Sequence, residues 1–187
     1  LVPALLAGAR SIRHMVPLAP VSAQNIGRSR YPTPNSRNNL SSEAAIVTAS
    51  NRQYLLAQRP TGALQENDFT WTESAVPEIG PDEVLVRSIY LSLDPANRGW
   101  VNDVATYRPP VGLGEPMAGF VIGRVVASNR DGLTVGDIVE GDGGWQNYAV
   151  HGPEAKLHKL PPGDDLVARM SVRGVTGLTA YWGLLDI

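Results

Sequence analysis

The sequence contains no cysteine, and this single absence removes three kinds of chemistry. Disulfide bonds, thiolate metal ligands and cysteine nucleophiles all require a thiol. Histidine is scarce too, with three residues, of which His151 and His158 are seven positions apart and separated by Pro153. That spacing near an expected strand does not place both imidazoles on one helical face. We therefore expect no bound metal.

A long apolar run and a surplus of positive charge are also absent. The apolar start of the chain, residues 1–9, is far too short to span a membrane. A net charge of −2 and a pI near 5.9 argue against the basic surface that nucleic-acid-binding proteins present. We expect neither a membrane nor a nucleic acid as a partner, and the 43% of apolar residues can build a globular core.

Lysine is missing from the first fifty residues, which hold five arginines and a single acid, Glu43. The change in composition places a boundary near Ala49, and we expect residues 1–48 to be a disordered extension because prolines interrupt any helical pattern there. Two alternatives stay open: an organellar transit segment, or sequence from upstream of the start, since residue 1 is not Met. The expected location is cytoplasmic, or organellar if residues 1–48 are a transit segment.

From residue 51 onward, short apolar stretches alternate with turns that are rich in glycine and proline. Short strands at near-regular spacing indicate a mainly β fold, either a sandwich or a partly open barrel. The expected strands cover residues 53–57, 69–74, 84–93, 120–128, 138–139, 145–150 and 157–160. In the second of them Phe69 and Trp71 alternate with Thr70 and Thr72, and Gly123 in the fourth suggests a bulge or a close backbone approach.

Two helical segments are expected after these strands. Asp164 and Asp165 can begin a helical turn that reaches Arg169. Residues 176–185 carry apolar side chains three and four positions apart, which is typical of a helix with one apolar face. Those side chains are Leu178, Tyr181, Trp182 and Leu185. No alternation of strand, turn and helix follows in this sequence, so it predicts no doubly wound domain.

The longest expected strand ends in a cluster of polar side chains. Pro95 cannot donate a hydrogen bond to a sheet and pushes Asp94 out of helical geometry, so the strand ends there. Asp94, Asn97 and Arg98 then lie at the end of a sheet, where polar groups can face a cleft. The alternative is a structural turn that Asp94 caps and an Asp94–Arg98 ion pair closes.

The segments that follow narrow the options further. Residues 101–110 are polar and irregular, and they include Tyr107, so this loop could cover a cleft. Residues 112–119 are dense in glycine, but neither the GxGxxG pattern between a strand and a helix nor a phosphate-loop pattern occurs in the sequence. The residues therefore offer no recognisable grip for a dinucleotide pyrophosphate.

Four segments together resemble a known family: YLSLDPANRGW at 90–100, GEPMAGFVIGRVV at 114–126, VGDIVEGDGGWQNYAV at 135–150 and GVTGLTAYWGLLDI at 174–187. Residues 51–187 resemble the medium-chain dehydrogenase/reductase superfamily, and within it the zinc-independent, NADPH-dependent double-bond reductases. The resemblance implies that residues 49–173 form a GroES-like substrate domain, a mainly β, partly open barrel with short helices. Residues 174–187 would be the first helix toward a Rossmann domain that has no counterpart in this sequence. The lack of cysteine agrees with the zinc-independent branch.

The resemblance also implies a reaction and its site residues. Hydride from NADPH would reduce the C=C bond of an α,β-unsaturated carbonyl, and a hydrogen-bond donor would stabilise the enolate oxygen. By motif, Asp94, Asn97 and Arg98 would contact the substrate, and Tyr107 is added as a substrate contact from the loop that could cover the cleft. Thr179 and Tyr181 would contact the cofactor, although helix packing is the alternative for both.

No catalytic residue is assigned by the resemblance, because the family's main donor lies in the nucleotide-binding domain. The commoner family pattern is Asp-Pro-Tyr-Met-Arg, whereas this sequence has Ala96 and Asn97, which suggests a roomier pocket. The implied partners are a small α,β-unsaturated carbonyl and, as an open option, a second copy of the chain.

Two functional hypotheses remain. The first is an N-terminal substrate-domain fragment of an NADPH-dependent enone or alkenal reductase, inactive on its own. The second is a stand-alone, non-catalytic GroES-like binding or interaction module. We favour the first, because a sequence ending in an apolar helix would leave Leu184, Leu185 and Ile187 uncovered.

Overall fold

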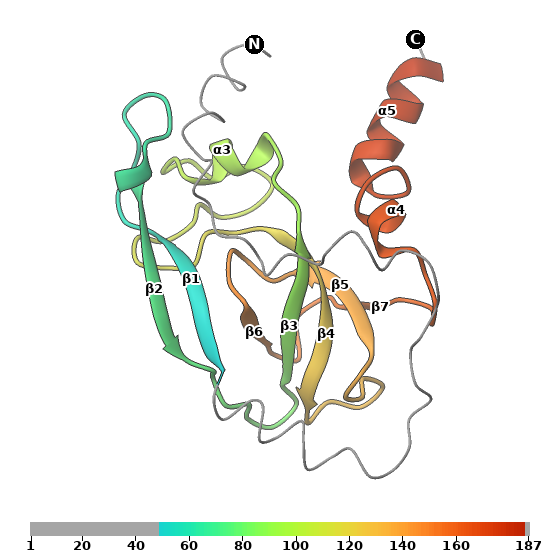
Figure 1. The fold of residues 1–187 in the computed structure, drawn as a ribbon. Helices are drawn as coiled ribbons and strands as arrows, with labels where there is room; N and C mark the ends of the chain where they lie inside the picture. Colours follow the sequence, from blue (N-terminus) through green and yellow to red (C-terminus); the bar gives the residue numbers. More distant parts are fainter. Residues whose placement is uncertain (1–48, 186–187) are drawn as a thin grey trace, which may run out of the picture.

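The computed structural model describes residues 49–185, which form two β-sheets with short helices at their margins (Figure 1). The expectations for residues 1–48 lie outside the described residues. The smaller sheet is an antiparallel pair, β1 (Ser50–Leu56) and β2 (Phe69–Ala75), joined by a loop that contains the 3-10 helix η3 (Glu66–Asp68).

The larger sheet contains five strands in the order β6-β3-β4-β5-β7, and every neighbouring pair is antiparallel. Its strands are β3 (Val84–Leu91), β4 (Phe120–Ser128), β5 (Ile138–Asp142), β6 (Tyr148–His151) and β7 (His158–Lys159). The helices are α3 (Ala96–Trp100), α4 (Leu166–Met170) and α5 (Val175–Leu185). The mainly β, partly open barrel expected from the sequence is confirmed.

Strand β1 connects the two sheets. Its Tyr54 donates a backbone hydrogen bond to Trp145 and accepts one from Met117, with N···O distances of 2.9 and 2.8 Å. The same strand bridges Gln146 and Pro116 in isolated antiparallel pairs. These partners lie in the segment before β4 and in the connection from β5 to β6, so backbone hydrogen bonds along β1 hold the two sheets together although the barrel is not closed.

Two apolar clusters fill the space between these elements. The first lies under α3 and the β1–β2 sheet, and the second lies on the larger sheet, where β-branched side chains alternate along the strands. Members of the first are Leu56, Trp100, Val101, Val111, Met117 and Ala118; members of the second are Val84, Val86, Val125 and Val139. Each fully buried aliphatic side chain contributes about 1.5–3 kcal/mol, so these clusters carry most of the stability.

The position of Gly123 inside an expected strand predicts a close backbone approach, and the structure confirms it between β3 and β4. A Cβ at this residue would collide with the side chain of Val86 and would lie 2.7 Å from the carbonyl oxygen of Arg87. The pairing of β3 with β4 changes register between Ser88 and Tyr90. Only glycine lets the two backbones come this close at the bulge.

Local details differ from the sequence-based expectations where tertiary packing decides them. The segment after Pro95 is the short helix α3 rather than the turn expected at the end of the strand. The alternating residues Phe69 and Trp71 of β2 are not both buried, since Phe69 packs on the core while Trp71 is 47% exposed. Among the described strands β2 is hydrogen-bonded only to β1, so its other edge is unpaired. None of the helices in the described part of the chain is long and apolar enough to cross a membrane.

Candidate functional site

The turn after β3 is organised by the side chain of Asn97. This residue is 7% exposed; its Oδ1 accepts a hydrogen bond from the backbone N–H of Asp94 at 2.6 Å, and its Nδ2 donates to the carbonyl of Ala118 at 2.9 Å. The Asp94 carboxylate accepts a bond from the Ser92 hydroxyl at 2.7 Å. Asn97 therefore fastens the start of α3 to the segment that leads into β4.

Arg98 has a different partner from the one the structural-turn alternative predicted. Its Nη1 donates to Asn102 Oδ1 at 2.8 Å, and its Nη2 donates to the carbonyl of Gly62 at 2.6 Å. The prediction of an Asp94–Arg98 ion pair is wrong, because the Arg98 guanidinium joins α3 to the loop between β1 and η3. Its two donor groups are thus engaged in holding that loop.

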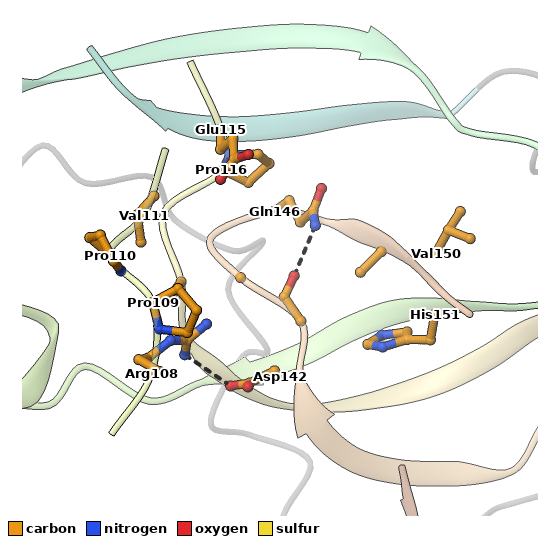
Figure 2. A pocket seen from close by; sticks show the side chains of 15 residues that line it. Arg108, Pro109, Pro110, Val111, Glu115, Pro116, Asp142, Gln146, Val150 and His151 are labelled. Atoms are coloured by element: carbon orange, nitrogen blue, oxygen red, sulfur yellow. Dashed lines mark hydrogen bonds and ion pairs between the residues drawn. The ribbon is translucent and has the colours of Figure 1, made fainter. Parts of the chain in front are cut away.

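A cleft of about 530 Å³ opens between the segment that precedes β4 and the hairpin that joins β5 to β6 (Figure 2). Such a volume suits a small organic ligand. One wall is rich in proline and the other contains glycine and the inner side of β6. Among the residues that line it are Arg108, Pro109, Ala118, Asp142, Gly143 and His151.

Arg108 is the main cationic group of this cleft. Its guanidinium lies over the Trp100 ring, 4.6 Å from the ring centroid, and its Nη1 is 3.5 Å from the Asp142 carboxylate. That separation is long for a charge-assisted hydrogen bond, which is normally 2.7–2.9 Å. Arg108 Nε is buried and has no hydrogen-bond partner among the described residues. Arg108 is therefore held mainly by stacking on Trp100, with donor capacity left over.

His151, at the end of β6, is 5% exposed and adds a neutral polar group to the cleft wall. Burial lowers its pKa below the ordinary value of 6.5; the Asp142 carboxylate acts in the opposite direction and Arg130 acts in the same direction. The imidazole is therefore uncharged at neutral pH. Within residues 49–185, its Nε2 finds no hydrogen-bond partner.

The glycines beside the cleft keep its backbone accessible. The carbonyl of Gly119 accepts hydrogen bonds from the N–H groups of Gly143 and Gly144, each at 3.0 Å. A Cβ at Gly119 would lie 2.6 Å from a Leu91 methyl group, and one at Gly143 would collide with Val121. Side chains are excluded at both positions by packing, so the two cleft walls meet through bare backbone.

The residues that the sequence predicted for substrate binding adjoin the cleft but do not line it. Asn97 positions Ala118, which is part of the lining. Tyr107 is 79% exposed and makes an edge contact with Trp100, the ring that also carries Arg108. The sequence reasoning missed Arg108 itself. Its signal was available, since it directly precedes Pro109-Pro110 in a loop that was expected to cover a cleft.

The residues predicted to contact the cofactor lie on α5, which projects from the body of the molecule on the side of β5 and β7 (Figure 1). Thr179 donates its hydroxyl to the carbonyl of Val175 at 2.7 Å. Tyr181 is 57% exposed and its ring packs edge-on against Trp182. The structure thus does not gather these two side chains with the residues of the cleft.

Two ligand classes can be tested against the described residues. No group of three or more His, Asp and Glu side chains within residues 49–185 is arranged to hold a metal ion. A dinucleotide pyrophosphate needs a glycine-rich turn between a strand and a helix. In the described part of the chain, no strand leads through such a turn into a helix, so these residues alone do not fit NADPH.

Comparisons with known proteins agree with this architecture. A family model described as the N-terminal domain of oxidoreductase matches residues 52–160. The NADPH-dependent curcumin reductase of Escherichia coli is 41% identical over 147 residues, covering 73% of this chain and 40% of that protein. The NADP(+)-dependent 2-alkenal reductase of Nicotiana tabacum is 31% identical over 144 residues, covering 74% of this chain and 42% of that protein.

A solved structure supports the same relationship. The crystal structure of CurA from Vibrio vulnificus in complex with NADPH matches with a TM-score of 0.65 and 40% identity, covering 73% of this chain and 40% of that one. The chain therefore belongs to the oxidoreductase N-terminal domain family of the medium-chain dehydrogenase/reductase superfamily. It spans about 40% of the length of the curated relatives it matches.

Proposed function

We propose that residues 49–173 are the substrate domain of an NADPH-dependent reductase that reduces the C=C bond of α,β-unsaturated carbonyls. Residues 174–187 are then the start of the connection to a nucleotide-binding domain. The observation that carries the proposal is the cleft beside the Asp94–Asn97–Arg98 turn, in a chain 41% identical to a protein named NADPH-dependent curcumin reductase. A mostly apolar cleft with a few fixed polar groups suits a flat, uncharged carbonyl compound.

The cleft residues divide the work of binding such a compound. Pro109 and Ala118 supply apolar walls, and Arg108 supplies N–H donors that its weak contact with Asp142 leaves available. A donor that approaches a carbonyl oxygen also stabilises the enolate that forms when hydride reaches the β-carbon. Asn97 and Arg98 hold the turn and its neighbouring loop, so their contribution to substrate binding is to shape the cleft rim. Tyr107 is exposed beside them and can close over a ligand.

NADPH, when bound, supplies the hydride. Since residues 49–185 contain no pyrophosphate-binding turn, the grip on the dinucleotide is assigned to residues outside this range. Thr179 and Tyr181 are exposed on α5, so they would be available to contact the bound cofactor. A cytoplasmic location is proposed with the function, and self-association stays open.

A two-part experiment tests the proposal. The 187-residue chain is compared with a fusion in which residues 49–187 replace the matching N-terminal part of the Escherichia coli curcumin reductase. NADPH oxidation is followed by absorbance with the aryl enone 4-phenyl-3-buten-2-one, and NADPH binding by fluorescence. We expect enone-dependent oxidation by the fusion, and neither binding nor oxidation by the 187-residue chain, because hydride transfer requires both walls of the site.

The intact bacterial relative is the positive control. A fusion that folds and binds NADPH but reduces no member of a panel of aryl and alkyl enones would reject the proposal and favour the stand-alone binding module. Turnover by the 187-residue chain would show that the assignment of the dinucleotide site to other residues is wrong.

A further inference from the structure

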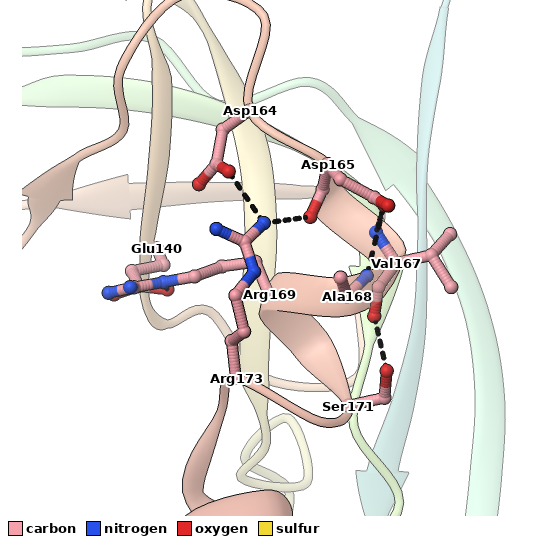
Figure 3. Close-up of polar contacts among 8 residues, drawn as sticks. All are labelled: Glu140, Asp164, Asp165, Val167, Ala168, Arg169, Ser171 and Arg173. Atoms are coloured by element: carbon pink, nitrogen blue, oxygen red, sulfur yellow. Dashed lines mark hydrogen bonds and ion pairs between the residues drawn. The ribbon is translucent and has the colours of Figure 1, made fainter.

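The unit formed by α4 and α5 is internally well braced. Asp165 caps α4, its Oδ1 accepting N–H bonds from Val167 and Ala168 at 3.1 and 3.0 Å. Arg173 donates to the Asp164 carboxylate at 2.6 Å and to the Asp165 carbonyl at 2.9 Å (Figure 3). The turn between the helices admits no side chain at Gly174, where a Cβ would lie 2.6 Å from the Arg169 carbonyl oxygen. The unit can therefore move as one body.

The attachment of this unit to the barrel is slight. Its α5 side chains Leu178, Tyr181 and Trp182 are 53, 57 and 60% exposed, so the helix does not lie against a sheet. The chain enters the unit through Pro161, Pro162 and Gly163, a linker that is exposed. Among residues 49–185, the hydrogen bonds that join side chains of the unit to the barrel all belong to one pair, Arg169 and Glu140.

The pair is well suited to hold the unit at one angle. Glu140 lies on β5 and is 8% exposed, so its carboxylate depends on a protein partner. Arg169 Nε donates to Glu140 Oε2 at 2.8 Å, and Arg169 Nη2 donates to Glu140 Oε1, which gives a two-point contact. The hydrogen bond to Glu140 raises the pKa of Arg169, so the guanidinium stays charged at every physiological pH. A bidentate contact fixes orientation as well as distance.

We infer that the Glu140–Arg169 pair is a latch that sets the orientation of the α4–α5 unit relative to the barrel and its cleft. Glu140 is followed within two residues by Asp142, which lines the cleft opposite Arg108. The latch thus joins the strand that ends at the cleft to the helix that carries Thr179 and Tyr181. The inference rests on the proposed function for its catalytic meaning, and it makes Arg169 and Glu140 positioning residues.

The latch can be tested without any activity, so its failure is separate from failure of the proposed function. Because the chain has no cysteine, Arg87→Cys on β3 and Leu184→Cys on α5 create a unique pair of spin-label sites at exposed positions. Double electron–electron resonance then measures the distribution of distances between the barrel and α5. We expect one narrow distribution in the parent chain.

Two variants release the latch in different ways. Arg169→Gln removes the cation, and Glu140→Leu with Arg169→Met replaces the pair by apolar side chains that bury no uncompensated charge. We expect the distance distribution to broaden at least twofold in both, while the double variant keeps a melting temperature near that of the parent. Lys159→Gln is the matched control, since it breaks the Lys159–Asp137 pair, 2.7 Å apart on the barrel, without touching the unit.

The outcomes decide the inference in either direction. A narrow distribution in the double variant, or an equal broadening in the Lys159→Gln control, overturns the latch. A broad distribution in the parent chain overturns it as well, because the pair would then hold nothing in place. If Arg169→Gln does not fold, the double variant alone decides.

Discussion

Replacement of Asn97 by alanine should be among the more damaging single changes near the candidate site. The side chain is 7% exposed and serves two backbone groups, the Asp94 N–H at 2.6 Å and the Ala118 carbonyl at 2.9 Å. Asn97→Ala leaves both without a partner at a position that water reaches poorly. An unsatisfied buried donor or acceptor costs about 1–3 kcal/mol, so we expect a loss of about 2–4 kcal/mol in the free energy of unfolding.

The assay is urea unfolding followed by tryptophan fluorescence, because Trp100 lies in the core beside Asn97 and Trp145 packs against the same cluster. The midpoint should fall while the slope with urea concentration stays constant. For a domain of this size the loss corresponds to a melting temperature lower by roughly 6–15 °C.

The matched control is Asn129→Ala. Asn129 also donates to a backbone carbonyl, that of Gly80 at 2.8 Å, but it is exposed, so water can replace the lost bond. We expect a change below about 1 kcal/mol for this variant. Equal losses for the two variants would refute the reasoning that the buried double contact of Asn97 fastens the turn to the cleft wall.

Two further predictions concern the cleft. Burial lowers the pKa of His151, so the unfolded chain binds a proton there at a higher pH than the folded chain does. The contribution of His151 to the free energy of unfolding is therefore fully present above pH 6.5 and decreases as the pH falls below it, by up to about 1.4 kcal/mol per pH unit. The free energy of unfolding, measured between pH 7.5 and about 5, should decrease with this slope in the parent chain and in His158→Gln, whose site is exposed. The slope should be smaller in His151→Gln, and equal slopes in the two variants would contradict the assignment of the effect to His151. In the active fusion, Arg108→Gln should lower kcat/KM about tenfold, or about 1.4 kcal/mol, because it removes the donor that faces the substrate. Arg87→Gln, at an exposed position of β3, should leave kcat/KM unchanged, and full activity of Arg108→Gln would remove Arg108 from the site.

Much of the barrel could be predicted because its signals are local. A proline such as Pro95 ends a strand because it lacks the N–H that a sheet needs. Glycine-rich turns separate strands whose apolar residues alternate. The close approach of β3 and β4 could be predicted from Gly123 for the same reason, since a glycine inside a strand often marks a bulge or a close backbone approach. The N-cap role of Asp165 is equally local and is confirmed. These inferences required knowledge of a few neighbouring residues only.

The site was harder to predict because its contacts join distant parts of the sequence. Arg108 is defined by the Trp100 ring and by Asp142, which lies 34 residues further on, and no periodicity reports such a contact. Asn97 was expected to face a ligand, yet it bonds the carbonyl of Ala118, 21 residues away. Polar residues on a turn can thus either contact a substrate or hold the segments that do.

The same distinction applies to α5. The helix was predicted correctly from its spacing of apolar residues, but spacing defines a face and not what the face is aimed at. Its aim depends on Glu140 and Arg169, which are 29 residues apart in sequence and on different elements. If two walls must close on one substrate, the angle between them matters as much as their composition, since a displacement of about 1 Å at the reacting atoms can cost two orders of magnitude in rate. The barrel supplies the first wall through β5 and Asp142, and the latch on the same strand sets the direction in which α5 leaves it.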